Sequence, residues 1–189
     1  AAALDRTVAT LCAEQGKAGL EFLCGVPGTI GGALRMNAGC YGREIKDALL
    51  TLQAVDRTGT FHNVPLSACG FSYRHCSLPT DWVFVSARFQ LENAPKEVLL
   101  ARLDEMLKRR EETQPVKSRT GGSTFANPEG YKAWELIDKA GCRGLRVGGA
   151  QVSEKHCNFL INTGDASAQD LEQLGEIVRT RVKEVSGID

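Results

Sequence analysis

A glycine-rich stretch between residues 25 and 42 contains the residue types best suited to holding a ligand against the backbone. It reads Gly25-Val-Pro-Gly-Thr-Ile-Gly-Gly-Ala-Leu-Arg-Met-Asn-Ala-Gly-Cys-Tyr-Gly42 and holds six of the 20 glycines in the chain. Glycine allows a close approach to the main chain, so the N–H groups here could face a phosphate or a flat heteroaromatic ring. Since many glycines weaken a helix or strand, we expect irregular backbone. Structural turns without a ligand are the alternative interpretation.

The spacing of these glycines excludes two common nucleotide fingerprints. The stretch contains neither Gly-x-Gly-x-x-Gly nor the phosphate-binding pattern that ends in Gly-Lys-Ser/Thr. Any ligand site in this stretch is therefore of a different type.

Arg74 lies in the run Phe71-Ser-Tyr73-Arg74-His75-Cys76. A permanently charged guanidinium can bind a carboxylate through two hydrogen bonds. It can also stabilise negative charge that develops during a reaction. The alternative is a surface arginine in an ion pair that contributes little to stability.

Ser123 follows a pair of glycines in Arg119-Thr-Gly-Gly-Ser123-Thr-Phe-Ala-Asn127-Pro128. A hydrolase nucleophile in a Gly-x-Ser-x-Gly turn would need glycine at position 125, which is phenylalanine, so the spacing excludes that chemistry. A serine is a weak acid that can donate a proton only through well-oriented hydrogen bonds. A plain turn serine is the alternative.

These motifs together resemble the UDP-N-acetylenolpyruvoylglucosamine reductases, the flavoprotein reductases of bacterial cell-wall precursor synthesis. The resemblance rests on Leu20 to Ala33, on Met36-Asn-Ala-Gly39, on Tyr73-Arg74 and on Gly-Ser123-x-Phe-x-Asn-Pro128, and it covers essentially the whole chain. It implies NADPH-dependent, FAD-mediated reduction of UDP-N-acetylglucosamine enolpyruvate to UDP-N-acetylmuramate in peptidoglycan precursor synthesis.

The resemblance also implies roles for particular residues. Arg74 would lie beside the enolpyruvyl group, and Ser123 would donate the proton that completes the reduction. The implied flavin contacts are Gly25, Val26, Pro27, Gly28, Thr29, Gly31, Gly32, Ala33, Asn37, Ala38 and Gly39. The candidate substrate contacts are Tyr73, Asn127, Arg143, Gln151, Lys155 and His156, because lysine and arginine neutralise a diphosphate and an amide can bind uracil.

Two alternative functions remain open. One is another FAD oxidoreductase of the same binding fold with a different small substrate. The other is a nucleotide-sugar-binding module without redox activity. Bound yellow flavin would distinguish the two oxidoreductases from the binding module, and the substrate that reoxidises reduced flavin would distinguish the oxidoreductases from each other.

The composition excludes several other classes of protein. Lysine plus arginine equals aspartate plus glutamate, 23 each, which argues against a nucleic-acid or polybasic membrane surface. No apolar run reaches the roughly 20 residues of a spanning helix. The seven scattered cysteines never form Cys-x-x-Cys, so we expect free thiols in a reducing cytoplasm and no metal site. We expect a bacterial cytoplasmic monomer.

Hydrophobic spacing and the resemblance predict an α+β chain: the C-terminal part of a FAD-binding domain at 1–108, then a smaller substrate-binding domain at 109–189. Apolar periodicity predicts helices at 2–15, 95–112 and 133–140, and alternation predicts strands at 48–55, 60–64 and 82–91. A last helix begins after Ser167, with Asp170 in a capping box.

Apolar spacing also predicts which helical side chains are buried. In the first helix these are Leu4, Val8, Leu11 and Cys12; in the second they are Val98, Leu99, Leu103, Met106 and Leu107; and in the last they are Leu171, Leu174, Val178, Val182 and Val185. The resemblance implies that the chain is incomplete at both ends and lacks a catalytic glutamate, a role we do not give to Glu172, Glu176 or Glu184. For the fragment alone we expect weak flavin binding and little or no turnover.

Overall fold

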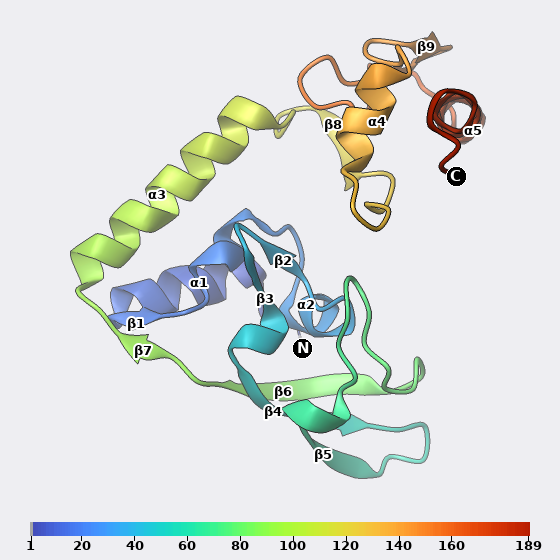
Figure 1. The fold of residues 1–189 in the computed structure, drawn as a ribbon. Coiled ribbons are helices and arrows are strands. Elements are labelled where there is room, and N and C mark those ends of the chain that lie inside the picture. The colour runs from blue at the N-terminus through green and yellow to red at the C-terminus, as the bar shows by residue number, and fades with distance from the viewer. Residues whose placement is uncertain (1) are drawn as a thin grey trace. The chain divides into compact units, whose positions relative to one another are not determined.

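The fold was analysed in a computed structural model that describes residues 2–189 (Figure 1). The chain forms two compact units, the first ending at Arg109 and the second spanning Arg110 to Asp189. Each unit combines helices with antiparallel strands, which confirms the predicted α+β class.

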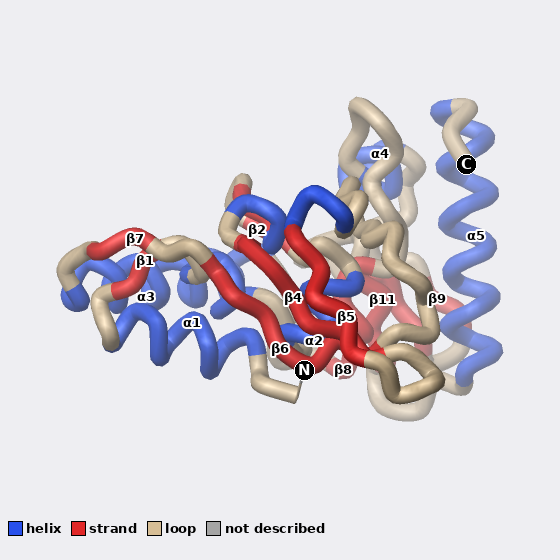
Figure 2. The backbone as a smooth tube through the Cα atoms, turned by 90° about the horizontal axis from the view of Figure 1, so that it is seen from below, coloured by secondary structure: helices blue, strands red, loops and turns tan. Residues whose placement is uncertain are grey.

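The first unit is built around a three-stranded antiparallel sheet in the order β5-β4-β6, with α2 lying against it (Figure 2). Its helical segments are α1 (Asp5–Glu14), η1 (Glu21–Gly25), α2 (Ile30–Arg35), η2 (Ile45–Asp47), η3 (Leu66–Ala68) and α3 (Lys96–Thr113), the last of which continues into the second unit. Its strands are β1 (Lys17–Ala18), β2 (Gly39–Cys40), β3 (Arg43–Glu44), β4 (Leu49–Val55), β5 (Phe61–Pro65), β6 (Val83–Phe89) and β7 (Glu92–Asn93).

Strand β4 shows how the sequence builds the core of this unit. Leu52 and Ala54 point to one face and are buried, whereas the intervening Gln53 is exposed. This is the alternation of a strand with one covered face. Phe22, Leu34 and other buried side chains from the helices fill the same core.

The buried face of α1 differs from the prediction. Asp5, Ala9 and Ala13 are buried, while Leu4 and Leu11 are 58% and 53% exposed. The helix packs against η1 through its alanines, whose short side chains allow the two segments to come close. Of the four predicted residues, Val8 and Cys12 are partly buried against the core, whereas the prediction was wrong for Leu4 and Leu11.

The second unit is a four-stranded antiparallel sheet in the order β8-β11-β10-β9, packed against α5 (Figure 2). Its elements are β8 (Arg119–Ser123), α4 (Ala133–Lys139), β9 (Arg146–Val147), β10 (Ala150–Val152), β11 (Phe159–Asn162) and α5 (Ala168–Ser186). Leu174, Val178 and Val152 are among its fully or almost fully buried side chains.

Helix α5 begins at the predicted capping box and ends at a glycine. Ser167 Oγ accepts a hydrogen bond from the Asp170 N–H, and the Asp170 carboxylate accepts one from the Ser167 N–H, which forms the capping box. Gly187 ends the helix in the left-handed conformation, at φ 73°. Of the predicted buried stripe, Leu174, Val178 and Val182 are buried and Leu171 is partly buried against the same core, but Val185 is 63% exposed.

Helix α3 buries a narrower stripe than predicted. Leu99 and Leu103 are buried, Met106 and Leu107 pack at the edge of the core, and Val98 is exposed. A helix that covers only part of a core buries a narrow stripe, here two leucines about one turn apart.

Two general expectations can be compared with the described residues. All seven cysteines are free thiols, as predicted, and five of them are buried. In the described part of the chain, no helix is both long and apolar enough to cross a membrane, and no group of three or more His, Cys, Asp or Glu side chains could hold a metal ion.

Candidate active site

Arg74 lies at the tip of a tight turn in the first unit. Ser72 and His75 exchange two backbone hydrogen bonds of 3.2 Å, so Tyr73 and Arg74 occupy the two turn positions between them. Arg74 has φ 53°, and its guanidinium carbon lies 4.9 Å from the centre of the Tyr73 ring. Both side chains are exposed. The turn therefore presents a cationic and an aromatic group together.

This turn is fastened to the glycine-rich stretch. Arg74 Nη2 donates a hydrogen bond of 2.8 Å to the carbonyl of Gly39. Asn37, which is fully buried, donates through Nδ2 to the Ser72 carbonyl at 3.1 Å and to Glu44 Oε2 at 2.9 Å. Its Oδ1 accepts from the Lys46 N–H at 3.1 Å. The structure thus brings Arg74 and the predicted flavin contacts into one neighbourhood.

The glycine stretch is more regular than predicted. Residues 25–29 and 36–42 are largely irregular, but Ile30–Arg35 form the short helix α2. Arg35 at the end of α2 donates hydrogen bonds of 2.8, 3.0 and 3.0 Å to the carbonyls of Leu78, Pro79 and Trp82. These contacts stabilise a helix that carries two glycines.

The glycines in this stretch are required for different reasons. A Cβ at Gly39 would lie 2.5 Å from the Arg43 carbonyl oxygen, so packing of β2 on β3 excludes a side chain there. Gly28 has φ 148°, which side chains rarely adopt. A Cβ at Gly32, by contrast, would meet only Thr29 Oγ1, at 3.9 Å. Protein packing therefore gives no reason for glycine at position 32.

Ser123 is the last residue of β8, where it pairs with Phe159 of β11. Its side chain is exposed, and the preceding Gly122 has φ 95°, a conformation that favours glycine. The Thr120 hydroxyl accepts the Gly122 N–H at 3.2 Å. The serine therefore follows a short glycine segment at which the pairing of β8 with β11 shifts register, between Thr120 and Ser123.

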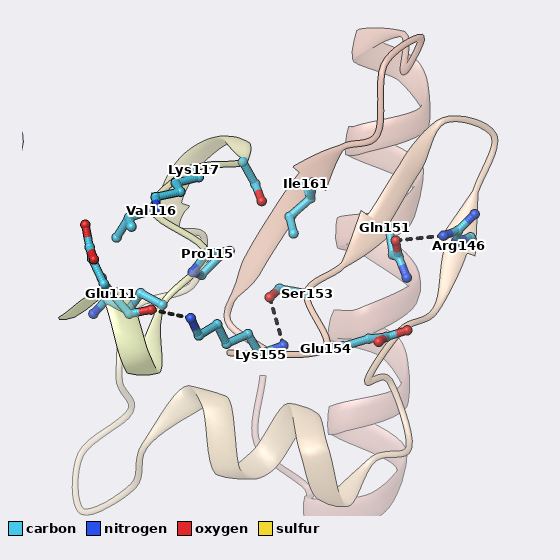
Figure 3. Close-up of a pocket in the computed structure, with 12 residues that line it drawn as sticks. Glu111, Pro115, Val116, Lys117, Arg146, Gln151, Ser153, Glu154, Lys155 and Ile161 are labelled. Carbon is cyan, nitrogen blue, oxygen red and sulfur yellow. Dashed lines mark hydrogen bonds between the residues drawn. The ribbon is translucent and has the colours of Figure 1, made fainter. Parts of the chain in front are cut away.

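A cavity of about 540 Å³ opens in the second unit, between the segment that follows α3 and strands β10 and β11 (Figure 3). Two of the predicted substrate contacts line it, Gln151 and Lys155. Lys155 Nζ bonds to the Glu111 carbonyl, and Gln151 Oε1 accepts from Arg146 Nη2 at 3.0 Å (Figure 3). The remaining lining residues are Gln114, Pro115, Val116, Lys117, Ser118, Ser153, Glu154 and Ile161. Three cationic and two acidic residues thus line the cavity together with amide and hydroxyl groups.

Three other predicted substrate contacts of this unit lie outside the lining of that cavity. Arg143 binds Asp138 through two hydrogen bonds of 2.9 and 2.8 Å, and this ion pair lowers the pKa of the Asp138 carboxyl. His156 packs edge-on against Phe159 at 4.9 Å, and burial lowers the pKa of its imidazole. Asn127 Oδ1 accepts the Ala133 N–H at 2.9 Å, at the start of α4.

His156 and Cys157 are adjacent in the sequence, which raises the question of a Cys–His catalytic dyad. They belong to the loop between β10 and β11. The Cys157 thiol faces Asp138 Oδ1 at 3.6 Å, and burial raises its pKa. A thiol with a raised pKa beside a carboxylate is poorly suited to nucleophilic chemistry.

Comparison with known proteins agrees with this architecture. A family model described as "UDP-N-acetylenolpyruvoylglucosamine reductase, C-terminal domain" matches residues 114–189, and one described as "FAD binding domain" matches residues 2–65. The crystal structure of UDP-N-acetylenolpyruvylglucosamine reductase from Thermus caldophilus superimposes with a TM-score of 0.86 at 38% identity, covering 98% of this chain and 67% of that one. The chain belongs to the UDP-N-acetylenolpyruvoylglucosamine reductase family.

Sequence relatives within the reductase family are closer still. The reductase of Paramagnetospirillum magneticum is 61% identical over 100% of this chain and 62% of its own length. That of Parvibaculum lavamentivorans is 59% identical over 99% of this chain and 60% of its own length. The chain therefore spans about three fifths of the length of these curated relatives.

Several residues of this reductase-family chain stand out only in the structure. Lys117 and Arg146 add positive charge to the cavity, and only Pro115-Val-Lys117 directly after a helix could have drawn attention to the first. Asp5 is 1% exposed, and neither of its side-chain oxygens has a hydrogen-bond partner among the described residues. Burial raises the pKa of Asp5 to about 6. Nothing in the spacing of α1 distinguishes this aspartate from a surface residue.

Proposed function

We propose that the protein containing this chain is an NADPH-dependent, FAD-mediated reductase that converts UDP-N-acetylglucosamine enolpyruvate to UDP-N-acetylmuramate. The observation that carries the proposal lies in the first unit. The Arg74 guanidinium bonds to the Gly39 carbonyl, so a carboxylate-binding cation borders a glycine-lined backbone. The family of the chain supports the same reaction.

The residues present fit a flavin in one specific respect. Glycine inside an exposed helix costs about 1 kcal/mol relative to alanine, yet packing within the protein leaves room for a Cβ at Gly32. A flat ligand lying close to α2 would explain this glycine. Residues 25–29, 31–33 and 37–39 would hold the FAD, with the Asn37 side chain fixing the backbone from inside the protein.

When bound, FAD supplies the transfer of hydride between NADPH and the substrate. Arg74 binds the substrate carboxylate and stabilises the negative charge that develops as the alkene is reduced. Tyr73 lies beside that guanidinium and borders the same group. Ser123 Oγ holds the proton that is given to the carbon next to the carboxylate.

The cavity of the second unit supports a role in binding the nucleotide part of the substrate. Lys117, Lys155 and Arg146 would neutralise the diphosphate, and the Gln151 amide would bind uracil. We assign flavin binding to the unit that ends at Arg109 and nucleotide-sugar binding to the unit from Arg110.

Free thiols support a reducing location, so the proposal includes the bacterial cytoplasm. It also includes a monomeric protein, which the elution volume in size-exclusion chromatography would test.

The deciding experiment separates the two halves of the reaction in the complete gene product. FAD is titrated into the apoprotein, NADPH is added without oxygen, and loss of the visible flavin absorbance is followed. UDP-N-acetylglucosamine enolpyruvate should then restore the absorbance, whereas UDP-N-acetylglucosamine should not. A protein that binds the nucleotide sugar but no flavin would contradict the proposal and support a binding module.

A further inference from the structure

We infer that Asn158 is a positioning residue that fixes the backbone around Ser123, an inference that rests on the proposed function. Asn158 lies in the loop just before β11 and is 4% exposed. Its side chain makes two hydrogen bonds to a single residue of the neighbouring segment. Asn158 Oδ1 accepts the Phe125 N–H at 2.9 Å, and Asn158 Nδ2 donates to the Phe125 carbonyl at 2.9 Å.

The main chain of Asn158 adds a third bond to the same segment. Its carbonyl accepts the Thr124 N–H at 2.8 Å. The last ladder pair before these bonds is Phe159 with Ser123. A side-chain amide carries the same donor and acceptor as a peptide group. The asparagine therefore continues the β8–β11 pairing for two residues beyond the point where regular strand ends.

This continuation matters because of where Ser123 lies. Glycines with open space around them precede it, since a Cβ at Gly121 or Gly122 would meet nothing within 4 Å. The N-terminal side of the serine is therefore not held by packing, and the C-terminal side is held by Asn158. A misplacement of about 1 Å in a reacting group can cost about 100-fold in rate.

Asn162 offers a matched control. It lies on β11 in the same sheet, and its side chain also bonds to backbone groups, accepting the Gly164 N–H at 2.8 Å and the Ala166 N–H at 3.1 Å. These bonds close the loop before α5 and do not involve residues 123–125. Both asparagines bond to backbone groups through their side chains, but they hold different segments, and Asn158 is the more deeply buried.

The test uses the complete gene product with bound FAD. The rates of flavin reduction and of flavin reoxidation are both measured and divided by the amount of flavin that becomes reduced. We expect Asn158→Ala to slow reoxidation by UDP-N-acetylglucosamine enolpyruvate about 10- to 100-fold. The rate of flavin reduction by NADPH in Asn158→Ala should stay within about twofold of the wild-type rate. In Asn162→Ala the rates of both steps should stay within about twofold of the wild-type rates. Counting per reduced flavin removes any contribution from unfolded molecules.

Two results would overturn the inference. One is unchanged reoxidation in Asn158→Ala, and the other is an equal loss in both steps, which a general structural defect would give. If Asn158→Ala does not bind flavin, Asn158→Asp keeps the shape and the acceptor for the Phe125 N–H, and the same ratio of steps decides. A wild-type protein that performs neither step would instead contradict the proposed function.

A separate observation leads us to infer that Asn37 positions Arg74. Its three side-chain hydrogen bonds reach Glu44, Lys46 and the turn residue Ser72. Its φ of 39° is a conformation that asparagine tolerates better than most residues. The same segment accepts the Arg74 guanidinium two residues later, at Gly39. Asn37 therefore sets the distance between the glycine stretch and the Tyr73-Arg74 turn.

The test compares two ligands that differ only in the enolpyruvyl carboxylate group. In Asn37→Gly, which keeps the left-handed backbone accessible, the Kd for UDP-N-acetylglucosamine enolpyruvate should rise about tenfold. The Kd for UDP-N-acetylglucosamine should stay within about twofold. Adding Asn37→Gly to Arg74→Ala should have little further effect. Asn93→Ala, in the same unit at an exposed position, serves as the control.

Equal weakening of both ligands, or full additivity with Arg74→Ala, would overturn this second inference. If Asn37→Gly fails to bind flavin, Asn37→Asp at the same position is carried through the same comparison. Weaker binding of UDP-N-acetylglucosamine enolpyruvate alone would still support the inference. Equally weaker binding of both nucleotide sugars would still contradict it.

Discussion

The two units hold their candidate catalytic residues by different means. In the first unit Arg74 lies on a turn between irregular segments, and side chains such as Asn37 and Arg35 fasten that turn and the glycine stretch. In the second unit Ser123 ends a strand that is paired with β11, and the Asn158 side chain extends that pairing to Phe125. Irregular backbone needs side-chain hydrogen bonds to become rigid, whereas a strand inherits its rigidity from its neighbour.

The largest expected effect concerns Ser123. In the complete gene product, Ser123→Ala should reduce the rate of flavin reoxidation by the enolpyruvyl substrate about 10²- to 10⁴-fold, the range typical of general acid catalysis. Reduction by NADPH should be spared. Anaerobic stopped-flow absorbance measures both steps, and Ser186→Ala, at the far end of α5, is the control. Equal damage to both steps would remove Ser123 from the proton-donating role.

Two glycines in the first unit should respond in opposite ways. Gly39→Ala should lower the free energy of unfolding by about 1–3 kcal/mol, because its Cβ would meet the Arg43 carbonyl at 2.5 Å. Gly32→Ala should raise it by up to about 1 kcal/mol, because alanine is the better helix former and has room.

The same Gly32→Ala variant should bind FAD at least about tenfold more weakly. Urea unfolding without flavin and fluorescence titration with flavin measure the two effects. If alanine at position 32 leaves flavin affinity intact, the glycine-lined backbone of the first unit does not contact the cofactor at α2.

A buried charge should make the first unit sensitive to pH. The Asp5 carboxyl is buried, has no hydrogen-bond partner among residues 2–189, and has a pKa raised to about 6. A raised carboxyl pKa means that the folded state holds the proton more tightly, so the contribution of Asp5 to stability is fully present below about pH 4 and is lost as pH rises through 6.

Asp5→Asn should therefore raise the free energy of unfolding at pH 8 by about 1–3 kcal/mol and change it little at pH 4. Unfolding measured across this pH range tests it, with the exposed Asp104→Asn as a control. A pH-independent effect would mean that the Asp5 carboxyl keeps its ordinary pKa.

The smallest expected effect concerns the capping box of the second unit. Ser167→Ala should destabilise the chain by about 1 kcal/mol, because the Asp170 N–H loses its side-chain acceptor. Chemical denaturation measures this loss. Ser67→Ala in the exposed η3 of the first unit should be nearly neutral.

Much of the fold follows from local patterns, and much of the site does not. The cap of α5 and the strands around residues 49–55 and 83–89 follow from residue type and alternation. The buried face of α1 does not follow from such patterns. Alanines are buried there because α1 lies close to η1, and the spacing of apolar residues does not reveal that contact.

The same division holds within the site. Gln151 and Lys155 were predicted from the family resemblance and from the chemistry of an amide and a cation, and the structure brings both to one cavity. Arg143 is a cation like Lys155, but its guanidinium binds the carboxylate of Asp138, five residues earlier in the chain. Which cation meets a carboxylate and which remains for a ligand depends on loop geometry, and residue type does not determine it.

The buried thiols give this protein a built-in set of reporters. Cys24, Cys69 and Cys76 lie in the first unit, and Cys142 and Cys157 lie in the second. A buried sulfhydryl reacts with an alkylating reagent only when the surrounding structure opens. Mass spectrometry of labelled peptides would therefore measure the rate of local opening in each unit separately, in the protein without substitutions.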